Sequence, residues 1–427
     1  MSHWCTLVFV LVFVSCAPLA HADELDDLAR DFWSWRASEM PVSNDDIPRL
    51  ERPAEWVPDW SPAAAARYQR ELEQFEARWK KLDASSWPVP RQVDYRLIGS
   101  AIARVRWELH ITRAWQRNPL FYKDQTVGAF FSLLLPPPPF DAARTRVIVR
   151  TLQSFPRTLH DAKSNLTQPI RPFAQLTINL LKDARPTLLQ SIRELKPRLD
   201  RTASVGIDAA AEEAASALES YRDWLTQCLP AMATQTAIGR NNYIFFLKNV
   251  ALLPYTPEQL LDIGHQDWAR AVSFQTYEEH RNTGLPDLPI AKTIDEQISR
   301  EEKGEQAVRR FMEDKNILSV PPWMQHYLHR PMPPYMEVLL DFEPGEADDF
   351  TSPSRLKENG IRYITPPSPD LGYFMMVNAK DRAQASFMKA CPATTSNSRF
   401  PGPIQTPFAA TTTIPVRMKE SASMPKK

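Results

Sequence analysis

Glycine is scarce in this sequence, and proline is abundant. There are 11 glycines and 39 prolines in 427 residues. This balance indicates helices separated by proline-containing turns, and it argues against a β-sandwich or a Rossmann architecture.

Cysteine is scarce as well, and the four cysteines form no recognisable pattern. No pair is spaced as CxxC, and none lies in a cluster with histidine, so a cysteine-based zinc site is disfavoured. Cys5 and Cys16 belong to the N-terminal segment, and Cys391 belongs to the C-terminal one. Cys228 is predicted to be a small buried apolar residue.

The sequence has no excess of charge of either sign. It contains 51 basic and 51 acidic residues. From residue 383 onward there are six basic residues and one acidic residue, so the part before it carries a net charge of −5. A net negative chain argues against a nucleic-acid surface, and no nucleic-acid partner is expected.

The apolar run at residues 6–14 is too short to cross a bilayer, which takes about 20 residues, and no membrane span is expected. An A-x-A site ends at Ala22, so residues 1–22 are predicted to be a cleaved signal peptide. Two alternatives stay open, namely lipidation of Cys16 and an ordinary buried N-terminal segment. Cleavage or lipidation implies a secreted or periplasmic protein or a lipoprotein.

Apolar residues recur at spacings of three and four along much of the chain, as on one face of a helix. These stripes predict helices near residues 25–35, 61–79, 94–116 and 208–225. Ser61 followed by proline is a good helix N-terminus. The chain is long enough to bury a sizeable core, and we expect a mainly α fold in one large helical domain.

Residues 239–282 predict two further helices. The first is expected over residues 239–253. The second begins strongly, because Thr256 can act as N-cap and Gln259 can complete a capping box. It is predicted to run to about His280.

No set of histidines and carboxylates has the spacing of a metal site. His265 and Asp267 do not share a helix face, and Glu278 lies about 20 Å from His265 along the axis. His326 and His329 are bracketed by prolines, and no carboxylate follows the first. Exposed helix charges are the better interpretation of the first set, and the histidine pair is not predicted to bind a metal.

The segment at residues 360–381 is the last one with a clear pattern. Arg362-Tyr363-Ile364 leads into a rigid turn at residues 366–370, and residues 372–377 form a β-prone apolar run. A small β element is therefore predicted near residues 336–378. From residue 383 onward neither a helical nor a strand period is present.

Three strings resemble the bacterial family called domain of unknown function 885. They are Gly239-x-x-x-Tyr243, residues 253–258 with Gly264, and residues 362–367 followed by Asp370 and Gly372-Tyr373-Phe374. Members of that family look like secreted helical zinc metallopeptidases. The resemblance therefore implies a helical fold, a zinc cofactor and a peptide substrate.

The resemblance also implies a substrate pocket made of Tyr243, Arg362, Tyr363 and Tyr373. Tyr363 and Tyr373 would hydrogen-bond an oxyanion, and Arg362 would meet a substrate carboxylate. A structural role in turns is an equal alternative for these three residues. In the intact family zinc would lower the pKa of a bound water and polarise the scissile carbonyl.

The zinc-binding motif of the family, His-Glu-x-x-Pro-Gly-His, is not present in this sequence. In the family it follows the Arg362 segment within a few residues. Here the triplets that begin on the last base of each codon from Phe387 allow it. Met388-Lys389 forces the Glu, and the codons through Ser398 allow the remaining residues. We therefore predict that the residues after about Arg382 are out of frame.

Three segments are thus expected: a signal peptide at 1–22, a helical domain at 23–381 that is incomplete at its C-terminus, and a disordered out-of-frame tail at 382–427. The predicted function is that of an inactive homologue of a secreted zinc metallopeptidase, without intact catalytic residues or metal ligands. The alternative is a non-catalytic helical binding or scaffold protein of the periplasm.

Overall fold

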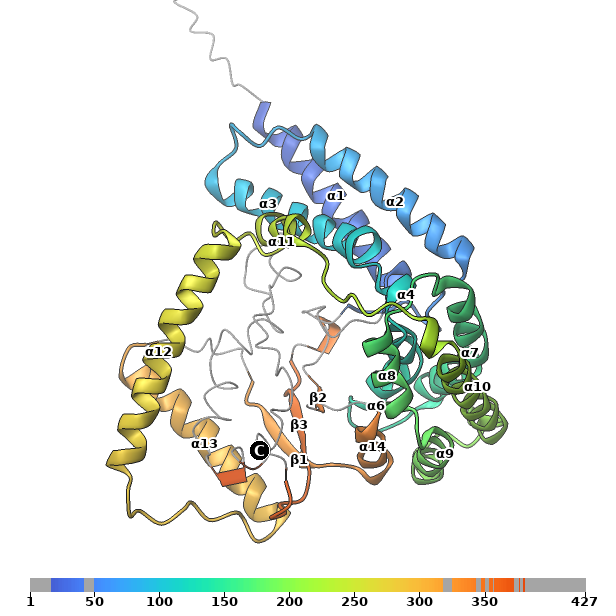
Figure 1. Cartoon of the computed structure of the whole chain (residues 1–427), viewed down its shortest axis with the longest axis vertical. Coiled ribbons are helices and arrows are strands. Elements are labelled where there is room, and N and C mark those ends of the chain that lie inside the picture. The colour runs from blue at the N-terminus through green and yellow to red at the C-terminus, as the bar shows by residue number, and fades with distance from the viewer. Residues whose placement is uncertain are drawn as a thin grey trace, which may run out of the picture.

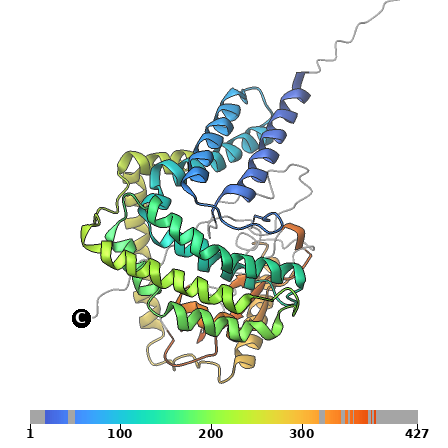
Figure 2. The same ribbon diagram turned by 90° about the vertical axis from the view of Figure 1, so that its right-hand side faces the viewer.

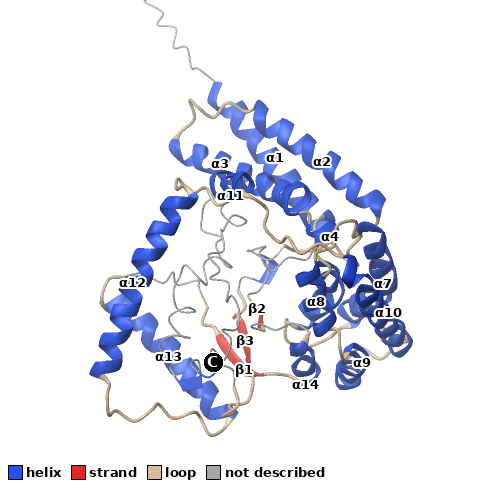
Figure 3. Ribbon diagram, in the orientation of Figure 1, coloured by secondary structure: helices blue, strands red, loops and turns tan. Residues whose placement is uncertain are grey.

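The computed structural model describes residues 17–41, 50–317, 325–342, 347–349, 353–355, 357–371, 376 and 379–380. Helices dominate these residues, and three short strands form one small sheet (Figure 3). The expected mainly α fold is confirmed. None of the described helices combines the length and the apolar character that a membrane crossing needs.

The α-helices are, in chain order, α1 (Ala17–Glu39), α2 (Pro62–Lys81), α3 (Val89–Arg106), α4 (Ala114–Arg117), α5 (Leu120–Lys123), α6 (Ala129–Leu134), α7 (Ala142–Asn165), α8 (Arg171–Leu180), α9 (Ala184–Leu195), α10 (Ile207–Cys228), α11 (Arg240–Phe245), α12 (Pro257–Arg281), α13 (Ile294–Asp314) and α14 (Pro334–Glu337). π-Helical turns are η1 (Trp107–Thr112), η2 (Asp124–Gly128) and η5 (Phe246–Val250), and 3-10 turns are η3 (Lys196–Arg198), η4 (Leu229–Ala231), η6 (Val338–Asp341) and η7 (Pro353–Arg355). The strands are β1 (Leu328–Pro331), β2 (Asp348–Asp349) and β3 (Ile361–Ile364).

The caps predicted from the sequence are confirmed. The Ser61 hydroxyl accepts a hydrogen bond from the backbone of Ala64 at 3.3 Å and begins α2. Thr256 and Gln259 form both hydrogen bonds of a capping box at the start of α12. Such bonds satisfy backbone N–H groups that have no partner inside the helix.

The helix expected at residues 94–116 has different bounds. α3 begins at Val89 because prolines are tolerated in a first helical turn. The chain then passes into the π-helical turn η1 and breaks at Arg113, whose φ is 48°. The spacing of apolar residues continues across this break, so the sequence did not indicate that the helix ends there.

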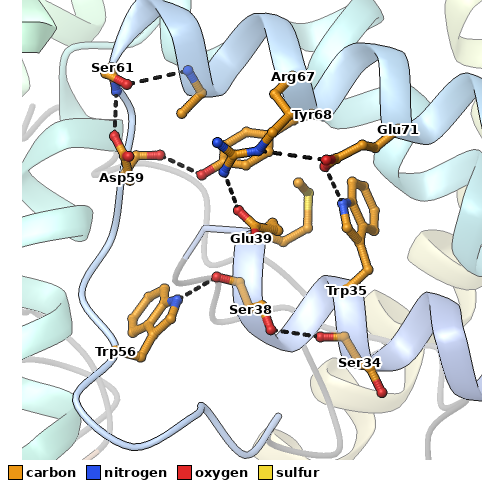
Figure 4. A network of polar contacts seen from close by, with 12 residues as sticks. Ser34, Trp35, Ser38, Glu39, Trp56, Asp59, Ser61, Arg67, Tyr68 and Glu71 are labelled. Atoms are coloured by element: carbon orange, nitrogen blue, oxygen red, sulfur yellow. Dashed lines mark hydrogen bonds and ion pairs between the residues drawn. The ribbon is translucent and has the colours of Figure 1, made fainter.

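Helices α1, α2 and α3 pack against one another and project from one end of the molecule (Figure 2). Leu25 and Phe32 of α1 are buried against Leu72 of α2 in the core. Polar contacts close the same interface, since Trp35 donates to Glu71 at 2.7 Å and Arg67 donates to Glu39 at 2.5 Å (Figure 4).

The remaining core lies around α7, α9 and α10, where α7 and α9 both pack on α10. Phe155, Leu188, Leu218 and Tyr221 are buried there. In Figure 1 this layer forms one side of an arch, α12 and α13 form the other side, and α1–α3 with α11 connect them. The sheet lies between α13 and α14 (Figure 1).

The sheet has the strand order β1-β3-β2, with β1 parallel and β2 antiparallel to β3. The β element predicted near 336–378 is confirmed for β2 and β3, whereas β1 begins earlier at Leu328. Of the β-prone run at 372–377, the structure describes Met376 alone, and Met376 is helical. The predicted cleavage site at Ala22 falls inside α1, and Cys16 and residues 382–427 lie outside the described residues.

Candidate functional site

The central strand β3 carries two of the four pocket residues that the resemblance implies. Arg362 and Tyr363 are 6% and 7% exposed. As neighbours in a strand they point to opposite faces of the sheet. Arg362 is aligned with His329 of β1 on one side and with Asp348 of β2 on the other. The side chains of Arg362 and Tyr363 therefore cannot line the same wall of one pocket.

The Tyr363 hydroxyl donates a hydrogen bond to the Leu135 carbonyl at 3.0 Å. Burial raises the pKa of this hydroxyl, and Tyr335 and Asp349 raise it further. Tyr363 therefore stays protonated at neutral pH, and its hydrogen bond connects β3 to the end of α6. A role toward an oxyanion stays a prediction.

The other two pocket residues are placed differently. Tyr243 is 40% exposed and lies on α11, which packs on η5 and α12. Figure 1 shows α11 beside α3, across the arch from β3. Tyr373 lies outside the described residues. The structure thus places Arg362 and Tyr363 on the same strand, β3, and Tyr243 on a different element, α11.

Helix α13 presents a buried polar stripe to the sheet. Gln297, Glu301, Glu305 and Arg309 recur every four residues on one helix face, and each is less than 9% exposed. The Gln297 amide donates to Glu301 at 3.0 Å, and Glu305 forms an ion pair with Arg309. Ionised side chains are rarely buried without such partners.

The two histidines considered in the sequence analysis, His326 and His329, contact this buried polar stripe. His326 Nδ1 lies 2.9 Å from Glu305 Oε2, and His329 Nε2 lies 3.4 Å from Glu301 Oε2. His329 belongs to β1 and is 1% exposed, whereas the His326 side chain is 56% exposed. Each carboxylate can hold its imidazole in one orientation.

These pairs do not fit a zinc ion. A catalytic zinc takes three protein ligands and keeps one position open. Within the part of the chain that the structure describes, no three or more histidine, cysteine, aspartate or glutamate side chains are grouped as a metal site requires. His265 and Asp267 lie on the exposed helix α12, where Asp267 pairs with Arg270.

Sequence reasoning missed Glu301 and Glu305. Their spacing of four residues with Gln297 and Arg309 was the available signal. That spacing is ordinary for solvent-exposed ion pairs on a helix, so the sequence could not distinguish a buried stripe from an exposed one.

Comparisons with known proteins agree with the fold. No curated protein matches the chain. Among solved structures, one described as "a putative lipoprotein of unknown function" from Shewanella oneidensis is similar, with a TM-score of 0.52 and 17% identity over 87% of this chain and 67% of that chain. At this identity the likeness shows the fold alone. The model of the family described as bacterial protein of unknown function (DUF885) matches residues 49–287. Because this match covers more than half of the 427 residues, the chain belongs to that family.

Proposed function

We propose that this chain is the helical scaffold of a secreted zinc metallopeptidase, read here in a frame that omits its zinc-binding helix, and that it has no peptidase activity as translated. Family membership supports the scaffold, and the codons after Phe387 support the missing helix. Because the described residues do not fit zinc, no catalytic step is assigned to them.

The observation that carries the proposal is the exposure of α12. This helix has 25 residues, and none of them is buried. Its large apolar side chains include Trp268 and Phe274, which are 68% and 65% exposed. A helix in a folded protein normally buries its apolar face, so α12 has the sequence of a packed helix and the environment of an unpacked one.

Seven apolar residues of α12 lie on one side of the helix, where at about 100° per residue they cover about half of the circumference, whereas Ala269 and Tyr277 lie outside this arc. We call this set the apolar face of α12, and it consists of Leu260, Leu261, Ile263, Trp268, Ala271, Val272 and Phe274. An exposed apolar patch of this kind indicates a surface that another element should cover. A metal-binding helix with the chain that follows it is the element that the family would supply.

The test begins with the DNA. If the codons from Phe387 to Ser398 do not encode the motif in the shifted frame, the proposal is wrong. If they do, a single-base insertion near the codon of Arg382 restores the frame. The restored protein should contain about one zinc per chain and hydrolyse peptides. Replacing the restored glutamate with glutamine should abolish hydrolysis and leave zinc bound.

A folded, restored chain without zinc would instead favour the non-catalytic binding or scaffold protein. Stoichiometric zinc in the protein as translated would contradict the proposal directly. Both outcomes are read by elemental analysis of purified protein, so they do not depend on finding a substrate.

We also propose that the protein is exported. The solved structure with a similar fold is described as a lipoprotein, and Cys16 offers a lipidation site in this chain. Intact-mass analysis of the exported protein separates the two routes. A chain that begins at Asp23 indicates cleavage by signal peptidase, and a lipid-modified Cys16 indicates an anchored protein.

A further inference from the structure

A pocket of about 540 Å³ is lined by residues of the helical part of the molecule. Three segments form it: the end of α4, the turn between α7 and α8, and the chain that follows α10. Arg117, Gln168, Ile170, Cys228, Met232 and Gln235 are among its lining residues. Small-molecule pockets have volumes of about 300–1,000 Å³, so this one can hold a small organic ligand.

Backbone hydrogen bonds fix the walls of this pocket. The N–H of Gln168 donates to Gln116 at 3.2 Å, and the N–H of Ile170 donates to Arg117 at 3.0 Å. Arg171 N–H then donates to Ala233 at 2.7 Å. The three segments are therefore held together by main-chain contacts.

Three guanidinium groups gather here without a carboxylate partner. Arg113 donates to the Gln168 side chain at 3.1 Å, and Arg117 donates to the Gln235 carbonyl at 3.3 Å. Arg171 donates to the carbonyls of Leu229 and Pro230. All these acceptors are neutral. Within the described part of the chain, no acidic side chain forms an ion pair with any of the three arginines.

The sequence of the walls explains this imbalance. Residues 109–123, 162–182 and 224–257 contain no aspartate or glutamate. Elsewhere, arginines of this protein commonly pair with carboxylates, as Arg185 does with Glu212 and Glu219. Uncompensated positive charge in a concave site raises the local concentration of anions.

Backbone strain occurs at the same place. Arg113 has a φ of 48° and directly follows the π-helical turn η1. A left-handed conformation is unfavourable for a residue with a side chain, and such strain is concentrated at ligand sites. π-Helical turns are likewise frequent at functional sites. Here they place Arg113 against Gln168 of the pocket wall.

We propose that this pocket binds a small organic carboxylate, with its carboxylate held by Arg117 and its apolar body against Ile170 and Met232, and with the positive charge of Arg113 beside the site through its hydrogen bond to Gln168. Arginine suits this role because its planar fork matches a carboxylate. The apolar residues among the lining, which are Pro169, Ile170, Ala231, Met232 and Ala233, favour a ligand with a short hydrocarbon body. The inference does not depend on the zinc peptidase proposal.

Cys228 provides the readout, because it is a free cysteine that lines the pocket. The full chain is treated with neutral iodoacetamide, and alkylation of Cys228 is followed by peptide mass mapping, which separates it from the other cysteines. The probes are N-acetyl-L-leucine, its uncharged amide and inorganic phosphate. N-acetyl-L-leucine should slow alkylation, and the amide should not.

Variants test the role of the arginines. Arg117→Gln should raise the concentration of N-acetyl-L-leucine needed for half protection about tenfold or more, because a charge-assisted pair is lost. Arg113→Gln should also weaken protection, and it leaves the lining residues of the pocket unchanged. The proposal can therefore still be tested if the Arg117 variant misfolds. Arg193→Gln, on the exposed face of α9, should leave protection unchanged.

The other outcomes overturn the proposal. Equal protection by the amide would show an apolar pocket that does not recognise charge. Protection by phosphate alone would show an inorganic anion site. Protection that is unchanged in both pocket variants, or that is absent with the carboxylate, would show that the arginines do not form a carboxylate site.

Discussion

Glu305 and Glu302 lie on the same helix but have very different surroundings. The Glu305 side chain is 2% exposed and pairs with Arg309 and His326. Glu302 is 37% exposed and lies 3.8 Å from Arg330. Removing one member of a buried pair leaves the other charge buried and unpaired, whereas an exposed pair contributes little.

Glu305→Ala is therefore expected to lower the free energy of unfolding by about 3–5 kcal/mol. Glu302→Ala, the matched control, should change it by less than about 0.5 kcal/mol. Urea denaturation of both variants measures the difference. Similar, small effects of the two substitutions would show that the α13 stripe is not a buried contact in solution.

His110 lies on η1, and its Nε2 atom is buried without a hydrogen-bond partner in the described part of the chain. Burial lowers the pKa of the imidazole, and the nearby Arg106 lowers it further. In the unfolded chain the pKa is about 6.5. As the pH falls through that value the unfolded chain binds the proton first, so stability decreases.

We expect His110→Gln to lose this acid-induced decrease, because glutamine does not titrate. The denaturant midpoint is measured at neutral pH and at successively lower pH values, for the variant and for the unchanged chain. Above the unfolded-state pKa the difference between the two should be constant. Parallel pH profiles below it would contradict the assignment.

At the scale of elements, α12 is held by local interactions, since it buries none of its own residues. Its stability then depends on helix propensity and capping more than on packing. Gly264 lies in this helix, and a Cβ added there would meet nothing within 4 Å. Gly99 of α3 is the opposite case, because a Cβ there would lie 2.5 Å from the ring of Trp79.

Gly264→Ala should stabilise α12 by up to about 1 kcal/mol, which slows amide exchange in the helix about fivefold. Gly99→Ala should instead destabilise the α2–α3 contact by about 1–3 kcal/mol, because Trp79 must move. Hydrogen exchange resolved by peptide measures the first effect, and denaturation measures the second. Unchanged exchange after Gly264→Ala would indicate that α12 is packed in solution.

At the scale of the whole molecule, the apolar face of α12 makes self-association the expected behaviour of the chain as translated. Exposed apolar patches of this kind are aggregation liabilities. Trp268→Glu with Phe274→Glu should reduce light scattering and the binding of a hydrophobic dye. Val205→Glu, at an exposed valine on another surface, should not. A sharp cooperative melt of the unchanged chain without aggregation would contradict this expectation.

Local patterns let the sequence predict much of this architecture. Helix stripes and the caps at Ser61 and Thr256 depend on residues within a few positions of one another, so they can be read without a structure. The short motifs around Tyr243 and Arg362 identified the family for a similar reason. A small β element was likewise expected in the region that contains Tyr363, but neither its strand β3 nor the hydrogen bond from Tyr363 to Leu135 was predicted.

Contacts between distant segments could not be predicted in this way. Cys228 was expected to be buried, yet it is only half-buried and lines a pocket. The break at Arg113 was also missed, because the apolar period of α3 continues across it. Both residues lie against the turn after α7, since Arg113 donates to Gln168 and Cys228 lines the same pocket, and this turn lies about fifty residues beyond Arg113 in the sequence.

The sequence by itself therefore determined α1, α2, α10 and α12, the caps at Ser61 and Thr256, and the family, because each depends on neighbouring residues. Only the tertiary structure decided which charges are buried and which arginines have no acidic partner. A glutamate on a helix has the same local sequence whether water or a strand covers it. The environment comes from segments that fold against it, as β1 does against Glu301 and the residue His326 before β1 does against Glu305.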